Sequence, residues 1–123
     1  MRIVEIKNQS RPLAAPLRLD YCDGFAAKLR GLAWRRALAA ERGILLVNAR
    51  ESRLNSAIHM LGMFFDLSIV WLDGEKRVVD ARRARRWRSI FVPRKPAQFV
   101  IECAVDRFDE LHIGDQIVFE DLP

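Results

Sequence analysis

The chain has 123 residues, half of them hydrophobic, with 21 basic and 16 acidic side chains and a net charge of +5. This length predicts a single domain, residues 1–123, that buries about two thirds of its unfolded surface and needs neither a disulfide nor a metal to fold. Residues 1–7 lack the apolar core of a signal peptide. The apolar stretch 57–72 contains His59 and Asp66 and is shorter than the ~20 residues of a membrane span. We therefore expect a soluble, cytoplasmic protein with no membrane association and no cofactor.

Apolar and alternating segments, separated by turn residues, predict eight strands and two short helices. A first helix is expected over residues 23–32, where Phe25, Leu29 and Leu32 form an apolar stripe at helical spacing. A second, shorter helix is expected over residues 106–111. The predicted strands are residues 2–7, 17–21, 43–48, 57–60, 67–72, 77–81, 98–104 and 116–120.

The continuous apolar run at 69–72, closed by Asp73-Gly74, predicts a central strand that is buried on both faces. Many short strands at near-regular spacing favour an antiparallel or mixed sheet over alternating parallel βαβ units. We therefore expect an α+β fold, as a compact, mainly-β, barrel-like domain whose sheet curls toward closure. One interior is expected to bury Trp71, Leu72, Ile69, Phe25, Leu29, Phe99, Ile101, Ile117 and Phe119 together.

His59, Met60 and Met63 are soft or borderline metal ligands, and Cys103 joined to them in space would suit Cu(I). In a strand, however, His59 and Met60 point to opposite faces, and methionine commonly fills gaps in a core. No closed set of nitrogen and sulfur ligands is visible, so we expect no metal. Because the chain shows no export signal, Cys22 and Cys103 are expected to be reduced thiols.

The sequence also contains side chains suited to acid–base or hydrolytic chemistry, but no catalytic motif surrounds them. Ser56 and His59 are three residues apart, which places them on opposite faces of a strand. Asp66 follows two phenylalanines, so it is expected at a pocket rim or paired with an arginine. The enzyme hypothesis is a pocket around His59, Asp66 and Arg53, with an unknown reaction. The candidates for such chemistry are His59, Asp66, Ser56, Ser68, Asp80 and Glu102.

Residues 82–95, which we call the basic segment, read RRARRWRSIFVPRK and contain seven basic side chains and no acidic one. Without them, 14 basic residues face 16 acidic ones. Guanidinium groups bind phosphates, and a tryptophan ring stacks on a base or sugar. The alternative is a solvated rim with Trp87 packed on the sheet. We favour a binding or accessory module that captures an anionic ligand, such as a polyanion or nucleic acid. The ligand-binding residues would be Arg82, Arg83, Arg85, Arg86, Trp87 and Arg88.

Short motifs along nearly the whole chain resemble a small prokaryotic family, domain of unknown function 192. They are Lys28-Leu29-Arg30-Gly31-Leu32, Ile58-His59-Met60 followed by Met63, Trp71-Leu72-Asp73, Val78-Val79-Asp80, Val100-Ile101-Glu102 and Ile113-Gly114-Asp115. Where the family commonly has Phe-Pro-Ile-Asp, this chain has Phe65-Asp66-Leu67-Ser68, so Ser68 replaces the family's aspartate. The resemblance implies a fold and no settled biochemical activity.

Overall fold

The computed structural model describes residues 2–24, 32, 37–60, 62–87 and 90–123. These residues form nine strands and one 3₁₀ helix, η1 (Val105–Glu110). All eight predicted strands are present, with bounds shifted by up to four residues, and only β7 was not predicted. The strands are β1 (Ile3–Asn8), β2 (Leu17–Cys22), β3 (Arg42–Ser52), β4 (Ile58–His59), β5 (Leu67–Leu72), β6 (Val78–Ala84), β7 (Ile90–Phe91), β8 (Ala97–Ala104) and β9 (Ile117–Asp121).

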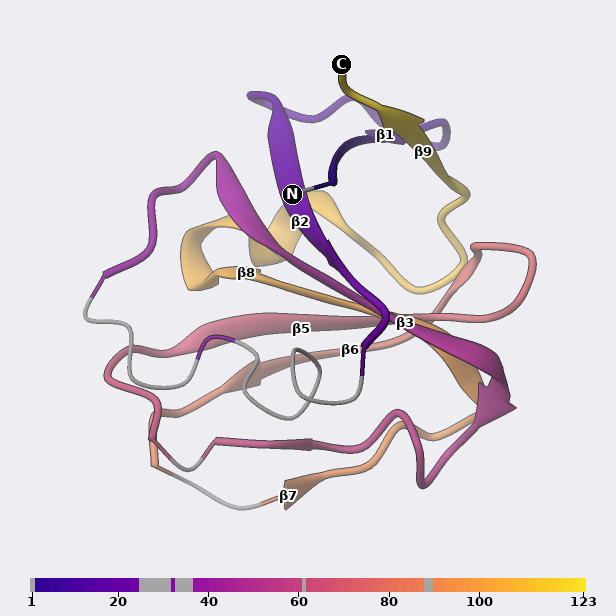
Figure 1. Ribbon diagram of the computed structural model, residues 1–123. Coiled ribbons are helices and arrows are strands. Elements are labelled where there is room, and N and C mark those ends of the chain that lie inside the picture. The colour runs from indigo at the N-terminus through magenta and orange to yellow at the C-terminus, as the bar shows by residue number, and fades with distance from the viewer. Residues whose placement is uncertain (1, 25–31, 33–36, 61, 88–89) are drawn as a thin grey trace.

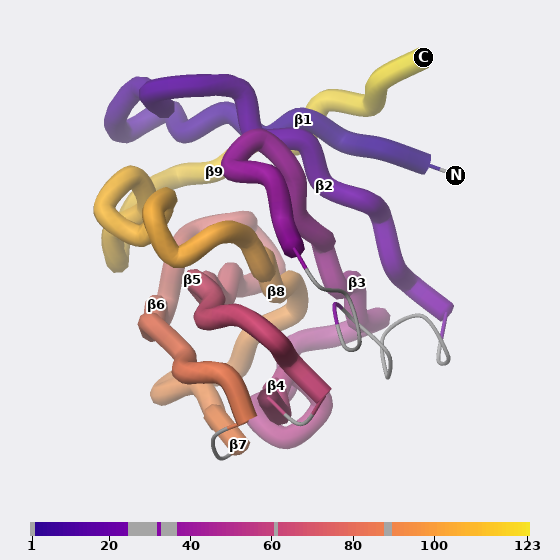
Figure 2. The backbone as a smooth tube through the Cα atoms, turned by 90° about the vertical axis from the view of Figure 1, so that its left-hand side faces the viewer, coloured from indigo at the N-terminus to yellow at the C-terminus, as the bar shows by residue number. Residues whose placement is uncertain are grey.

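Seven strands form one mixed sheet in the order β6-β5-β8-β3-β2-β1-β9, and β4 pairs with β7 in a separate two-stranded ribbon. Only β2 and β3 run parallel, and the other neighbouring strands are antiparallel. The β4–β7 ribbon lies at one end of the molecule, away from the two chain ends (Figures 1 and 2). No helix among the described residues is long and apolar enough to cross a membrane.

The expectation of a sheet that closes is wrong, because the larger sheet is open. The segments at the start of its edge strands, β6 and β9, meet at a bridge between Arg77 and Gln116. Three backbone hydrogen bonds surround this bridge, from the Val78 N–H to Asp115 at 2.9 Å, from the Gly114 N–H to Val78 at 2.8 Å and from the Ile117 N–H to Lys76 at 2.9 Å. Beyond this bridge, β6 pairs only with β5, and β9 only with β1. A closed barrel requires its first and last strands to be hydrogen-bonded to each other along their length. All five residues of β9 instead pair with β1.

The described residues contain no α-helix, so the expectation of an α-helix at 106–111 is wrong. The predicted helix at 106–111 is the 3₁₀ helix η1, whose preceding residue, Ala104, provides no side-chain cap. At its end the Leu111 N–H donates to Phe108, three residues back, as expected for a short 3₁₀ segment. Most of the helix predicted over 23–32, including Phe25 and Leu29, falls at residues 25–31, outside the described residues.

The sheet has two cores, one on each face, in place of the single predicted interior. Alternate residues of a strand point to opposite faces, and all six positions of β5 are buried. The first face, defined by Ile69 and Trp71, also carries Leu32. The second face carries Leu72, Ile101 and Ile117, with Phe99 and Phe119 in edge-to-face contact beside them. Among the predicted core residues that the structure describes, five are buried and Phe99 and Phe119 are partly buried, while those of β5 are divided between two interiors.

Both cysteines are free, as predicted. Cys22 packs against the first core and Cys103 belongs to the second, so the sheet itself separates the two sulfur atoms. Burial raises the pKa of the Cys103 thiol to about 12, which makes it unreactive near neutral pH.

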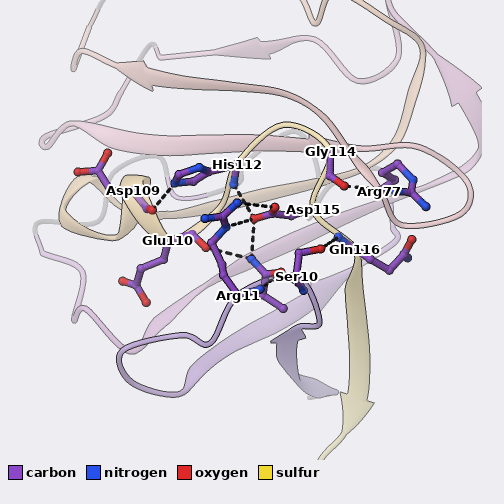
Figure 3. Close-up of polar contacts among 10 residues, drawn as sticks. Ser10, Arg11, Arg77, Asp109, Glu110, His112, Gly114, Asp115 and Gln116 are labelled. Atoms are coloured by element: carbon purple, nitrogen blue, oxygen red, sulfur yellow. Dashed lines mark hydrogen bonds and ion pairs between the residues drawn. The ribbon is translucent and has the colours of Figure 1, made fainter.

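A hydrogen-bonded carboxylate ties the end of β1 to the turn before β9 (Figure 3). Asp115 accepts bonds from Asn8 Nδ2 at 2.8 Å, from Arg11 Nε at 2.7 Å and from the His112 N–H at 2.9 Å. Its neighbour Gly114 has φ of +96°, a conformation that glycine adopts without strain. The motif Ile113-Gly114-Asp115 thus builds the turn that brings β9 to β1.

We expect Asp115 to make unfolding stability depend on pH in the acid range. Burial raises the pKa of this carboxyl, but the bonds from Arg11, Asn8 and His112 outweigh burial and lower it to about 2, from an ordinary 3.8. Because the folded pKa is the lower one, the stabilisation of about 2 kcal/mol is present above about pH 4 and is lost as the pH falls through 2. Urea unfolding of wild type and Asp115→Asn across this range tests it. Parallel stability curves for the two proteins would contradict the assignment.

Candidate anion-binding surface

Strand β6 directs the first two arginines of the basic segment to opposite faces of the sheet. Arg82 is opposite Ile69, on the first face, and its Nη2 lies 3.5 Å from Asp80 Oδ2. Arg83 projects from the second face, where its Nη2 lies 3.1 Å from Asp109 Oδ1. The Arg83 guanidinium carbon also lies 4.3 Å from the centre of the Phe108 ring. Each of these arginines therefore has a carboxylate partner within the protein.

Arg86 and Asp66 form a further pair just beyond β6. The Arg86 backbone N–H and Nε donate to Asp66 Oδ1 at 2.9 and 3.2 Å, and Nη1 donates to the Phe64 carbonyl at 3.3 Å. The backbone N–H bond, together with the guanidinium, lowers the pKa of Asp66 below its ordinary value. The sequence-based expectation that Asp66 pairs with an arginine is confirmed.

Trp87 has a backbone conformation that is rare for a bulky residue, with φ of +59°. Its N–H donates to the Met60 carbonyl at 3.1 Å, and its ring makes an edge contact with Phe64, the two centroids 5.7 Å apart. Even so, 47% of the residue remains exposed. Trp87 is therefore anchored by its backbone and one ring edge, while much of the indole faces solvent.

Two cations of the basic segment, Arg94 and Lys95, have no carboxylate partner among the described residues, and Arg85 acts on the Asp66 carboxylate without a hydrogen bond to it. Arg85, Arg94 and Lys95 are exposed, and none of their side chains forms a hydrogen bond or close ion pair with the described residues. The backbone N–H of Arg94 is held by Asp80 Oδ2 at 2.9 Å. Arg94 and Lys95 were not among the predicted ligand-binding residues, and no local sequence signal separates an unpaired cation from a paired one. Arg88 lies outside the described residues.

One pocket of the structure contains Asp66 but not the other residues of the enzyme hypothesis. Asp66 and Arg86 line a pocket of about 360 Å³ together with Ala37, Leu38, Phe65, Ala104, Val105 and Asp106. His59 is exposed on β4 opposite Ile90, and Arg53 Nε donates to the Pro93 carbonyl at 3.0 Å. Neither His59 nor Arg53 lines that pocket.

The prediction that the side chains of His59 and Met60 point in opposite directions is confirmed, since His59 is exposed whereas Met60 and Met63 belong to the first core. The described residues contain no group of three or more histidine, cysteine or acidic side chains arranged to hold a metal. Ser68, at the position of the family's aspartate, is buried, and its Oγ donates to the Ala104 carbonyl at 3.0 Å.

These features define a mainly-β domain built on an open, mixed seven-stranded sheet. The chain belongs to the DUF192 family, described as "Uncharacterized ACR", whose model matches residues 3–119.

The chain is similar to archaeal proteins named only as UPF0127 proteins. That of Thermococcus gammatolerans is 36% identical over 104 residues, which are 83% of this chain and 66% of the relative. That of Thermococcus kodakarensis is 33% identical over 114 residues, which are 91% of this chain and 71% of the relative. The chain thus spans about two thirds of the length of these relatives.

Two crystal structures have the same fold at low identity. One, described as a candidate transcription regulator from Sinorhizobium meliloti 1021, has a TM-score of 0.81 at 16% identity and covers 96% of this chain and 92% of its own. The other, from Novosphingobium aromaticivorans DSM 12444 and of unknown function, has a TM-score of 0.74 at 17% identity. The match covers 94% of this chain and 83% of that protein. At these identities the likeness shows the fold alone.

Proposed function

We propose that this protein is a binding module that captures an anionic ligand through the basic segment. The observation that carries the proposal is that the side chains of Arg85, Arg94 and Lys95 are exposed and form no hydrogen bond or close ion pair among the described residues, in the same segment as half-exposed Trp87. A free guanidinium or ammonium group binds phosphate oxygens, and an exposed indole stacks on a base. The positive φ of Trp87 costs free energy, which supports a role for its exposed ring beyond packing.

In this proposal, the arginines that pair with carboxylates also contact the anionic ligand. The side chains of Arg83 and Arg86 are 57% and 58% exposed although each meets a carboxylate. A guanidinium has five N–H donors, so each retains donors for a phosphate while it remains paired. Arg82 and Arg88 complete the proposed set. The ligand is a polyanion, nucleic acid included, and the proposed location is the cytoplasm.

Binding is expected to weaken steeply as salt rises, because each phosphate contact releases condensed counterions. In a plot of the logarithm of affinity against the logarithm of salt concentration, we expect a negative slope. Its magnitude should be about 0.7 per neutralised phosphate for a single strand and about 0.9 for a duplex. Replacing Arg85, Arg94 and Lys95 together by alanine should reduce the single-strand slope by about 2 and leave the melting temperature unchanged, since these exposed side chains form no hydrogen bond or close ion pair with the described residues. Fluorescence anisotropy with labelled oligonucleotides and a polyphosphate competitor measures this.

Lys7 and Arg18 provide the matched control, because both are exposed and both pair with Glu5 on the β1–β2 hairpin. Replacing them by alanine should leave the salt slope unchanged. Trp87→Ala should weaken single-strand binding by about 1 to 3 kcal/mol if the indole stacks on a base. The proposal fails if neither single-stranded nor duplex oligonucleotide nor polyphosphate binds at low salt.

A further inference from the structure

The β4–β7 ribbon buries one face and exposes the other. In this antiparallel pair, Ile58 lies opposite Phe91 and His59 lies opposite Ile90. Residues directly opposite each other point to the same side of a ribbon, and successive residues of a strand point to opposite sides. Ile58 and Phe91 pack on the first core, whereas His59 and Ile90 are exposed. The outer face of the ribbon therefore presents an imidazole beside an isoleucine that is 68% exposed.

Trp87 lies close to this exposed pair. Its N–H donates to the carbonyl of Met60 at 3.1 Å, and Met60 directly follows His59 in the chain. Trp87 is also three residues before Ile90, so their Cα atoms are at most about 11 Å apart. A single exposed hydrophobic residue is normal on a protein surface. Here, however, an isoleucine, an imidazole and a half-exposed indole gather at the end of the molecule where the ribbon lies (Figures 1 and 2).

Cations lie on both sides of this group along the chain. Arg85 comes shortly before β7, and Arg94 and Lys95 come shortly after it. Arg53 adds another exposed guanidinium, because its Nε donates to the Pro93 carbonyl in the segment after β7. The exposed apolar and aromatic groups are therefore flanked by positive charge on each side.

No acidic residue belongs to the two chain segments that build this region, residues 52–60 and residues 85–98. Asp66 and Asp80 approach the second segment from outside it, and each already accepts a backbone N–H of that segment. The charge of this region thus favours an anionic occupant. Its exposed rings and isoleucine favour an occupant that also presents flat, apolar surfaces.

We propose that the outer face of the ribbon, together with Trp87, binds the bases of a single-stranded nucleic acid whose phosphates contact the flanking cations. This inference rests on the proposed function and narrows its ligand. Indole and imidazole rings stack on bases, and Ile90 packs against the face of an unstacked base. A duplex keeps its base faces stacked inside, and polyphosphate has no bases, so neither ligand uses these side chains.

The first test compares two labelled strands by fluorescence anisotropy on the unmodified chain. One is an oligothymidylate of about ten nucleotides, within the usual site size of single-strand binding proteins. The other is an abasic strand of equal length, which has the same phosphates but no bases. The oligothymidylate should bind about tenfold more tightly, because one stacked base contributes roughly that factor.

Equal affinity for the two strands would overturn this inference and leave the proposed function intact. Tighter binding of polyglutamate than of the oligothymidylate would also overturn it, and would assign the surface to an acidic peptide. If no strand and no polyphosphate binds at low salt, the proposed function fails, and this inference fails with it.

Ile90→Ala tests the ribbon itself. It should weaken oligothymidylate binding about fivefold, because a base loses its apolar contact, and leave polyphosphate binding unchanged, because no charge is altered. His59→Ala should show a similar loss for the oligothymidylate, whereas His59→Phe, which keeps a ring, should not. Ile113→Ala is the matched control, because Ile113 is 59% exposed in the turn before β9, outside the ribbon.

Wild-type affinity for the oligothymidylate in both Ile90→Ala and His59→Ala would overturn the inference. An equal loss of polyphosphate binding in Ile90→Ala would also overturn it, since that loss would not involve bases. Thermal melts check that each variant is folded. If either variant is unfolded, the comparison of the two strands on the unmodified chain decides.

Discussion

Replacing Trp71 with alanine is expected to destabilise the folded protein by about 3 to 5 kcal/mol. Trp71 is fully buried in the first core, and β5 is buried at all six positions, so the surrounding strands cannot collapse easily into the cavity. The indole Nε1 also donates to the Ser56 carbonyl at 2.7 Å, which anchors the loop before β4. Urea unfolding followed by circular dichroism measures the loss.

Trp71→Phe separates the two contributions, because it keeps much of the ring and removes the hydrogen bond. We expect it to cost less than the alanine variant and to free the loop before β4, which hydrogen exchange of residues 54–57 would detect. Trp87→Ala is the comparison at a half-exposed tryptophan and should cost less than Trp71→Ala. An unfolding free energy for Trp71→Ala within about 1 kcal/mol of wild type would show that the central strand carries little of the stability.

Arg107→Ala is expected to cost a similar amount, about 3 to 5 kcal/mol, because it breaks a buried ion pair. Arg107 is 5% exposed, and its Nε and Nη2 both bond the Glu110 carboxylate. Its remaining donors reach the carbonyls of Ala15 at 2.6 Å and Ala40 at 2.7 Å. One guanidinium thus connects η1 to two loops that lie far apart in the sequence. Its loss removes a donor from the carbonyls of Ala15 and Ala40 and leaves the Glu110 carboxylate with the Ala14 N–H but without a charged partner.

Arg107→Lys tests whether charge alone is sufficient. A lysine ammonium is a compact point charge and cannot reproduce the planar fork, so most of the destabilisation should remain. Arg83→Ala is the matched control, because Arg83 forms an exposed pair with Asp109 of the same helix and should cost about 0 to 1 kcal/mol. Equal destabilisation by Arg83→Ala and Arg107→Ala would contradict the importance of burial.

Local pattern was sufficient to find the strands. The run at 69–72 predicted a strand buried on both faces, and β5 is buried at every position. The alternation of Phe99, Ile101 and Cys103 with polar neighbours predicted β8, and all three lie on or against the second core. Strand β7 was missed because its two residues are too short for a period-2 pattern to be visible.

The candidate surface was only partly predictable. Composition located the basic segment, but the pairing of its arginines depends on the carboxylates of Asp80, Asp109 and Asp66. Asp109 lies 26 residues from Arg83 along the chain, and Asp66 lies 20 residues from Arg86. Six predicted ligand-binding residues therefore appeared equivalent in the sequence, whereas the fold pairs Arg82, Arg83 and Arg86 closely with carboxylates and gives Arg85 only a longer-range interaction with Asp66.

The sequence by itself determined the strands, the reduced cysteines, the opposite placement of His59 and Met60, and the family, because each follows from residue type and near-neighbour spacing. Only the tertiary structure decided that the sheet stays open and that it carries two cores. These two properties depend on which strands lie side by side. Strand order is set by contacts between residues far apart in the chain, and no local periodicity records it.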